Sequence, residues 1–70
     1  MKKLGKIVST ENGKLVLKTD KDMRKGRQVY DESNRFIGNI IKIKEKGEEK
    51  YAVISTKKDP EPLIGEKIYG

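Results

Sequence analysis

The sequence contains no cysteine and no histidine. Disulfide bonds are therefore excluded, and so are metal sites that depend on thiolate or imidazole ligands. Acid–base chemistry would fall to Asp, Glu, Lys or Tyr, but the carboxylates gather in expected turns around Asp31 and Glu49, where water should keep their pKa values ordinary. The glycines are dispersed singly, which excludes a glycine-rich phosphate loop. We therefore expect a non-enzymatic protein without catalytic residues, cofactors or metal ligands.

Long apolar segments are also missing. No run approaches the roughly 18 residues that a membrane-spanning helix needs, and Met1-Lys2-Lys3 does not lead into an apolar signal segment. We expect a chain without a membrane segment that stays in the cytoplasm. At 70 residues, the chain suffices for one small domain, residues 1–70. Domains of this size without disulfides need an economical closed architecture or a partner.

Positive charge is present in excess. Lys and Arg number 17 against 11 Asp and Glu, which gives a net charge of +6. Such a balance favours polyanionic surroundings. Interspersed Lys and Glu are also typical of surface ion-pair networks in thermostable domains, so both interpretations stay open. The few aromatic residues are spread along the chain, and the sequence alone does not predict a shared platform for stacking bases.

Short segments rich in apolar and β-branched residues predict strands, and turn residues separate them. Asn12-Gly13 between two apolar segments is a strong hairpin signal, because both residues accept positive φ. Residues 31–34 form a second predicted turn, and Gly47 lies in a third. The expected strands are residues 4–9, 14–18, 28–30, 36–43, 50–55 and 66–69. About six short strands with almost no helix predict an all-β fold, a small closed barrel.

The central strand, residues 36–43, has apolar residues in both of its alternating sets. In a regular strand, odd-numbered and even-numbered residues face opposite sides, and we expect the odd set to fill the core. Phe36 and Ile40 are then left near the surface beside Gly38, where the missing side chain permits close approach of a partner. The alternative is a bulge that sends both sets inward at different points. The expected core consists mostly of Ile7, Leu15, Leu17, Val29, Ile41, Ile43, Val53 and Ile68.

Several segments of the chain are similar to one known family. They are Leu4-Gly5-Lys6-Ile7, Gly26 to Asp31, Arg35-Phe36-Ile37-Gly38, Tyr51-Ala52-Val53-Ile54, and Pro60 followed by Ile64 to Tyr69. In order and spacing they resemble the core of the Gar subunit of the H/ACA ribonucleoprotein, the archaeal guide-RNA particle that makes pseudouridine. The resemblance covers nearly the whole chain. It implies a six-stranded barrel of the translation-factor or reductase type.

The same resemblance implies a function and partners. The subunit would dock on the catalytic pseudouridine synthase subunit, assist turnover of substrate RNA and serve rRNA modification and ribosome biogenesis. Contact with guide RNA and rRNA would be indirect, and the isolated chain would be monomeric. The family's usual Phe-Gly-Pro step is replaced here by Lys44-Glu45-Lys46, which predicts a more polar rim around the interface. The expected docking surface consists of Phe36, Gly38, Ile40, Lys42, Lys44 and Tyr51.

Two other functions are compatible with the sequence. The segment from Gly26 to Ile54 also fits the PRC-barrel family, whose members would act as adaptors in RNA-processing or membrane complexes. The charge balance fits a small basic barrel that binds RNA directly, in which Tyr30 or Tyr51 would contact the bases.

Overall fold

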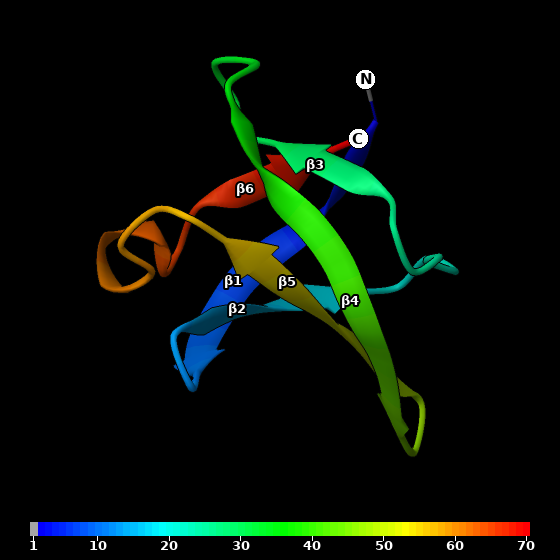
Figure 1. Ribbon diagram of the computed structural model, residues 1–70. Coiled ribbons are helices and arrows are strands. Elements are labelled where there is room, and N and C mark those ends of the chain that lie inside the picture. Colours follow the sequence, from blue (N-terminus) through cyan, green and yellow to red (C-terminus); the bar gives the residue numbers. More distant parts are fainter. Residues whose placement is uncertain (1) are drawn as a thin grey trace.

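Six antiparallel strands close into a barrel in the computed structural model, which describes residues 2–70 (Figure 1). The strands are β1 (Lys3–Glu11), β2 (Lys14–Thr19), β3 (Gln28–Tyr30), β4 (Phe36–Lys46), β5 (Glu49–Thr56) and β6 (Lys67–Tyr69). They follow the order β1-β2-β5-β4-β3-β6 around the barrel, and β6 returns to pair with β1. The predicted all-β fold and the six-stranded closed barrel are therefore confirmed.

The tight turns between strands contain residues that tolerate positive φ. Asn12 and Gly13, at φ 51° and 78°, join β1 to β2, which confirms the predicted hairpin. Gly47, at φ 63°, lies in the turn between β4 and β5. The β4–β5 hairpin extends away from the barrel body (Figure 1). A short 3-10 helix, Glu61–Leu63, precedes β6.

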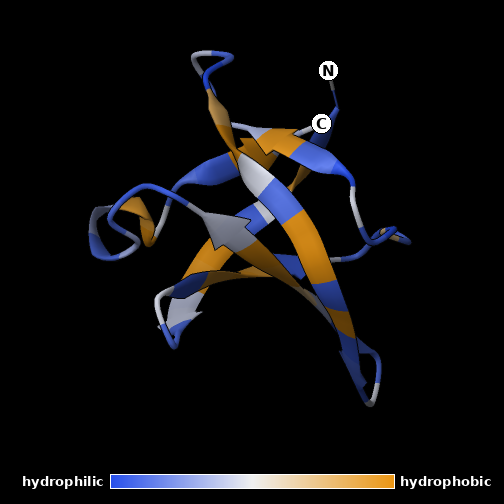
Figure 2. Ribbon diagram, in the orientation of Figure 1, coloured by the Kyte–Doolittle hydropathy of each residue, from blue (hydrophilic) through white to orange (hydrophobic). Residues whose placement is uncertain are grey.

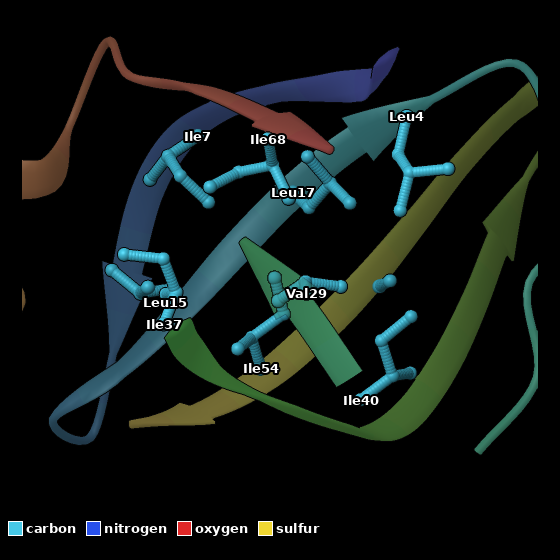
Figure 3. Close-up of a cluster of buried hydrophobic side chains, with 10 residues drawn as sticks. Leu4, Ile7, Leu15, Leu17, Val29, Ile37, Ile40, Ile54 and Ile68 are labelled. Atoms are coloured by element: carbon cyan, nitrogen blue, oxygen red, sulfur yellow. The ribbon is translucent and has the colours of Figure 1, made fainter. Parts of the chain in front are cut away.

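Aliphatic side chains from all six strands fill the barrel interior (Figure 3). Of the predicted core residues, Ile7, Leu15, Leu17, Val29 and Ile68 are confirmed as members of this cluster. Ile43 is only partly buried and packs against the cluster, while Val53 is buried outside it. The remaining members of the cluster are Leu4, Ile37, Ile40, Ala52 and Ile54. Each fully buried Leu or Ile contributes roughly 1.5–3 kcal/mol, which stabilises a small domain that has no disulfides.

Buried and exposed side chains do not alternate regularly along β4, and the expectation that Ile41 fills the core is wrong. Ile41 is 41% exposed, whereas Ile40 is 1% exposed. The reason is a β-bulge. Ile40 lies opposite Ile54 on β5, and the following pair joins Lys42 to Val53, which makes Ile41 the extra residue. An extra residue reverses the facing of the residues that follow it, so a strict odd-and-even pattern fails beyond this point.

A second irregularity lies near the start of β4. Val29 on β3 lies opposite Gly38, but Tyr30 lies opposite Phe36, which makes Ile37 the extra residue there. Ile37 and Gly38 are both buried as a result. The two irregularities turn members of both apolar sets inward at different points, as the bulge alternative predicted. Figure 2 shows the outcome as apolar and polar bands that follow one another along β4.

Gly38 permits close approach of another backbone, but that backbone belongs to this chain. A Cβ atom added at Gly38 would overlap the carbonyl oxygen of Ser55 on β5. Gly5 on β1 has the same relation to the carbonyl oxygen of Lys18 on β2. These glycines therefore bring neighbouring strands together within the barrel, and the prediction that Gly38 makes room for a partner protein is wrong.

Candidate functional site

The predicted docking residues are divided between the interior and the outer face of the barrel. Ile40 belongs to the core cluster and Gly38 is buried, so the expectation that they lie at the surface is wrong. Lys42, Lys44 and Tyr51 lie on the outer face, and Tyr51 is directly opposite Lys44 in the β4–β5 pair. The bulges explain the division, because they rotate the first part of β4 relative to its second part.

Phe36 lies at the other end of β4, where it is 49% exposed. It borders a surface depression of about 480 Å³, which we call the β4–β5 groove. The groove is lined by Phe36, Ile37, Gly38, Asn39, Ile41, Ser55, Thr56, Lys57 and Lys58. Two large exposed apolar side chains, Phe36 and Ile41, thus flank a hollow that has two lysines at its edge. This arrangement is typical of a protein-docking surface with a polar rim.

Contacts within the barrel hold the groove in shape. The rings of Tyr30 and Phe36 meet edge to face with centroids 5.9 Å apart. The hydroxyl of Thr56 donates a hydrogen bond of 2.8 Å to the carbonyl oxygen of Ile37, which ties the end of β5 to the start of β4. Such fixed side chains lose little conformational entropy when a partner binds.

Sequence reasoning missed Ile41 as a surface residue, although a signal for it was present. Ile40 and Ile41 are adjacent in a strand that otherwise alternates from Asn39 onward, and this break in the alternation is compatible with a bulge without showing which of the two residues faces the core. The bulge exchanges their expected positions, so that Ile40 is inside and Ile41 is outside.

Charged side chains surround Tyr51 at the hairpin end of the β4–β5 pair. The Tyr51 hydroxyl donates a hydrogen bond to the Glu49 carboxylate, and Lys18 Nζ lies 3.7 Å from the same carboxylate. Lys44 Nζ lies 3.0 Å from the carboxylate of Glu11 on β1. Ionic contacts therefore connect β2 with β5 and β1 with β4 near the hairpin end.

These contacts change the acidity of the groups involved. The hydrogen bond from Tyr51 and the charge of Lys18 lower the pKa of Glu49, and the same hydrogen bond raises the pKa of Tyr51. The hydrogen bond and charge of Lys44 lower the pKa of Glu11. The expectation of an ordinary pKa for Glu49 is wrong, because a neighbouring donor and cation favour the charged carboxylate. The shifts favour fixed charges at neutral pH, and they do not prepare a general acid or base.

Asp31 departs from its expected pKa as well, for a local reason. Its carboxylate accepts hydrogen bonds of 2.9 Å from the backbone N–H groups of Ser33 and Arg35, and Arg35 Nε lies 3.1 Å away. The backbone hydrogen bond from Arg35 is the main cause of the lowered pKa. Asn34, at φ 67°, completes the turn. Asp31 thus stabilises the turn into β4, and all of its contacts are local.

Residues 2–70 contain neither a cluster of metal-binding side chains nor a helix that could span a membrane. No group of three or more acidic, histidine or cysteine side chains that could bind a metal ion occurs there. No helix in this part of the chain has the length and apolar character needed to cross a membrane.

Comparisons with models of known protein families and with curated proteins found no match to this chain. The outer face offers two distinct surfaces, the β4–β5 groove and the charged hairpin end.

Proposed function

We propose that this chain is a non-catalytic docking subunit of a guide-RNA pseudouridylation particle, in which it binds the catalytic pseudouridine synthase subunit and assists turnover of substrate RNA. The observation that carries the proposal is the β4–β5 groove, where Phe36 and Ile41 are exposed by 49% and 41%. The closed barrel fits the resemblance to the Gar core, which supplies the identity of the partner.

The docking surface proposed here differs in its residues from the one expected from the sequence. Ile41 replaces Ile40, and Gly38 supports the surface from inside by allowing β4 to approach β5. Phe36 and Ile41 form the apolar centre, where binding energy concentrates once water is excluded. Lys57 and Lys58 at the edge, with Lys42 next to Ile41, affect the rate of association more than the affinity.

The test is calorimetric titration of the purified chain into the pseudouridine synthase subunit from the same organism. We expect Phe36→Ala and Ile41→Ser each to weaken association by at least about 10-fold, because hot-spot side chains cost more than roughly 1.4 kcal/mol on truncation. Val8→Ser is the matched control, because Val8 on β1 is 42% exposed and lies outside the groove. It should bind like the unchanged chain.

Turnover provides a second measurement. Adding the unchanged chain to a synthase and guide-RNA mixture should raise multiple-turnover pseudouridylation, and Phe36→Ala should reduce that gain. If the unchanged chain fails to bind the synthase, or if Val8→Ser weakens binding as much as Ile41→Ser, the proposed partner or the proposed surface is wrong.

A further inference from the structure

A row of four lysines and one tyrosine runs across the strands on the outer face of the barrel. Each member lies directly opposite the next in the sheet, from β6 through β1, β2 and β5 to β4. Directly opposed residues in antiparallel strands place their side chains on the same face. The row, which we call the lysine row, consists of Lys67, Lys6, Lys18, Tyr51 and Lys44.

The lysine row is unfavourable for the isolated fold. Lys6 lies opposite a lysine on both sides, Lys67 on β6 and Lys18 on β2, and like charges that face each other across strands are destabilising. Glu49 and Glu11 partly compensate Lys18 and Lys44. Among residues 2–70, neither Lys6 nor Lys67 has a carboxylate within 4.0 Å. A ligand that carries negative charges along a line would remove this repulsion.

The dimensions of the row favour a long ligand. Neighbouring strands are about 4.8 Å apart, so five residues in register follow the curved outer face over a path of roughly 19 Å, which is four of the six strand-to-strand steps around the closed barrel. A single small anion would reach one or two of the lysines, whereas a chain of phosphates can reach them all. A surface depression of about 540 Å³ borders Lys6 and Lys18 and has the exposed Val8 in its lining. Three carboxylates, Asp20, Glu48 and Glu49, and two further lysines, Lys3 and Lys21, also line it.

Tyr51 identifies the class of polyanion. Its ring is partly exposed between Lys18 and Lys44, and its hydroxyl is held by Glu49. An aromatic face inside a basic track is how proteins bind single-stranded nucleic acid, since each base can stack on the ring while the phosphates contact cations. An acidic protein segment has no need of such a face.

We propose that single-stranded nucleic acid lies along the lysine row, with its phosphates at Lys67, Lys6, Lys18 and Lys44 and a base stacked on Tyr51. The row lies toward the hairpin end of the β4–β5 pair and the β4–β5 groove toward the other end, although Ile41 of the groove and Lys44 of the row border one smaller depression between them. The inference therefore stands apart from the docking function. It adds a direct RNA contact to a subunit for which the resemblance implies only indirect contact.

Binding of a fluorescent oligouridylate of roughly 12 nucleotides, measured by anisotropy over a series of salt concentrations, tests the phosphate contacts. For four phosphate contacts, the logarithm of the affinity should fall with the logarithm of the salt concentration with a slope of about −3. Lys6→Gln/Lys67→Gln should lower the affinity at least about 10-fold at low salt and reduce the slope to about −1.4. Lys25→Gln/Lys58→Gln removes the same charge outside the row, and its affinity should stay within about 2-fold of the unchanged chain.

Two further arms test the stacked base and the ligand class. Tyr51→Ala should weaken oligouridylate binding about 5- to 150-fold, the value of one base stacked on an aromatic ring, whereas Tyr51→Phe should preserve it. Polyglutamate of similar length and charge should bind more weakly than the oligonucleotide. The proposal is overturned if polyglutamate binds as tightly, if the control double variant loses as much affinity as the row variant, or if Tyr51→Ala has no effect.

The same variants separate this proposal from the docking function. Lys6→Gln/Lys67→Gln should bind the synthase like the unchanged chain, and Phe36→Ala should bind oligouridylate like the unchanged chain. A result in which each variant affects both ligands equally would contradict the assignment of two separate sites.

Discussion

The two ends of the β4–β5 pair have opposite chemistry, although the same two strands form both. Where β4 begins, Phe36 and Ile41 flank an apolar groove. At the hairpin end, the exposed or half-exposed residues from Lys44 to Lys50 are charged apart from Gly47. Figure 2 shows the change from mixed bands to a hydrophilic tip along β4.

The difference follows from where the barrel interior ends. Ile43 is the last residue of β4 that packs against the core, and the strand continues to Lys46 beyond it. A strand that extends past the core has no apolar interior on either face, so both faces carry charge. At the other end, the core takes Ile37 and Ile40 and the bulge leaves Ile41 outside. The apolar groove is thus a consequence of the bulge, and the charged end is a consequence of strand length.

The largest expected effect is on the free energy of unfolding when a glycine at either end of the β4–β5 pair, Gly38 or Gly47, is replaced by alanine. Gly38→Ala should destabilise the fold by roughly 3 kcal/mol or more, because the new Cβ overlaps the carbonyl oxygen of Ser55 and two paired strands must separate. Gly47→Ala should cost only about 1–2 kcal/mol, since it has open space and only a positive φ to maintain. Urea unfolding of both variants measures the difference. Equal losses would show that close packing at Gly38 is not the dominant constraint.

The next comparison is between the two neighbouring isoleucines at the bulge, Ile40 and Ile41. Ile40→Ala should cost about 2–5 kcal/mol, because it leaves a cavity in the core. Ile41→Ala should cost less than about 1 kcal/mol, because its side chain is already largely in water. Thermal unfolding followed by circular dichroism can rank the two variants. The reverse ranking would mean that Ile41 and not Ile40 faces the interior.

The fold could be predicted from local sequence, because its main signals are local. Asn12-Gly13 specifies a hairpin through positive φ, and short β-branched segments specify strands. Leu15, Leu17, Val29 and Ile68 were placed correctly because burial alternates regularly in their strands, and Ile7 was placed correctly although β1 has register shifts on either side of it. A closed barrel follows once six short strands have to bury one face each.

The candidate site could be predicted only in part, because its residues depend on pairing between strands. A bulge is defined by the partner strand, so the facing of Ile40 and Ile41 cannot be read from β4 alone. The lysine row depends on the registers of four strand pairs, and Lys6 and Lys67 are distant in sequence. Charge composition favoured polyanionic surroundings but fitted a surface ion-pair network equally well, and only the register aligns the lysines in one row.

Asp31, which precedes β4, and Glu49, at the hairpin end, should respond differently to pH. The pKa of Asp31 is lowered by hydrogen bonds from backbone N–H groups and by Arg35, so its ionised form stabilises the fold. That contribution is present above the unfolded pKa of about 3.9 and is lost as the pH falls through the lower folded pKa. Asp31→Asn should cost roughly 1–3 kcal/mol at neutral pH and progressively less in acid.

Glu49→Gln is the control for this pH dependence. The pKa of Glu49 is also lowered, but its carboxylate is largely exposed, so solvent weakens its interaction with Lys18. Urea unfolding across a pH series should show a larger pH-dependent loss for Asp31→Asn than for Glu49→Gln. A pH-independent loss at Asp31 would assign its role to turn geometry and not to charge.

The smallest expected effect is a gain in stability. It concerns the lysine row, whose last member, Lys44, lies near the hairpin end of the β4–β5 pair. Lys6→Glu places a carboxylate opposite Lys18 and Lys67, so two repulsive cross-strand pairs become attractive. We expect the melting temperature to rise by roughly 1–8 °C at low salt and the gain to shrink as salt screens the charges. Lys25→Glu, the same change in the loop before β3, should leave the melting temperature nearly unchanged. Thermal unfolding at two salt concentrations measures both. A lower melting temperature for Lys6→Glu would contradict the repulsion between the lysines of the row. A higher melting temperature together with lost oligouridylate binding would show that the lysine row favours binding at the expense of stability.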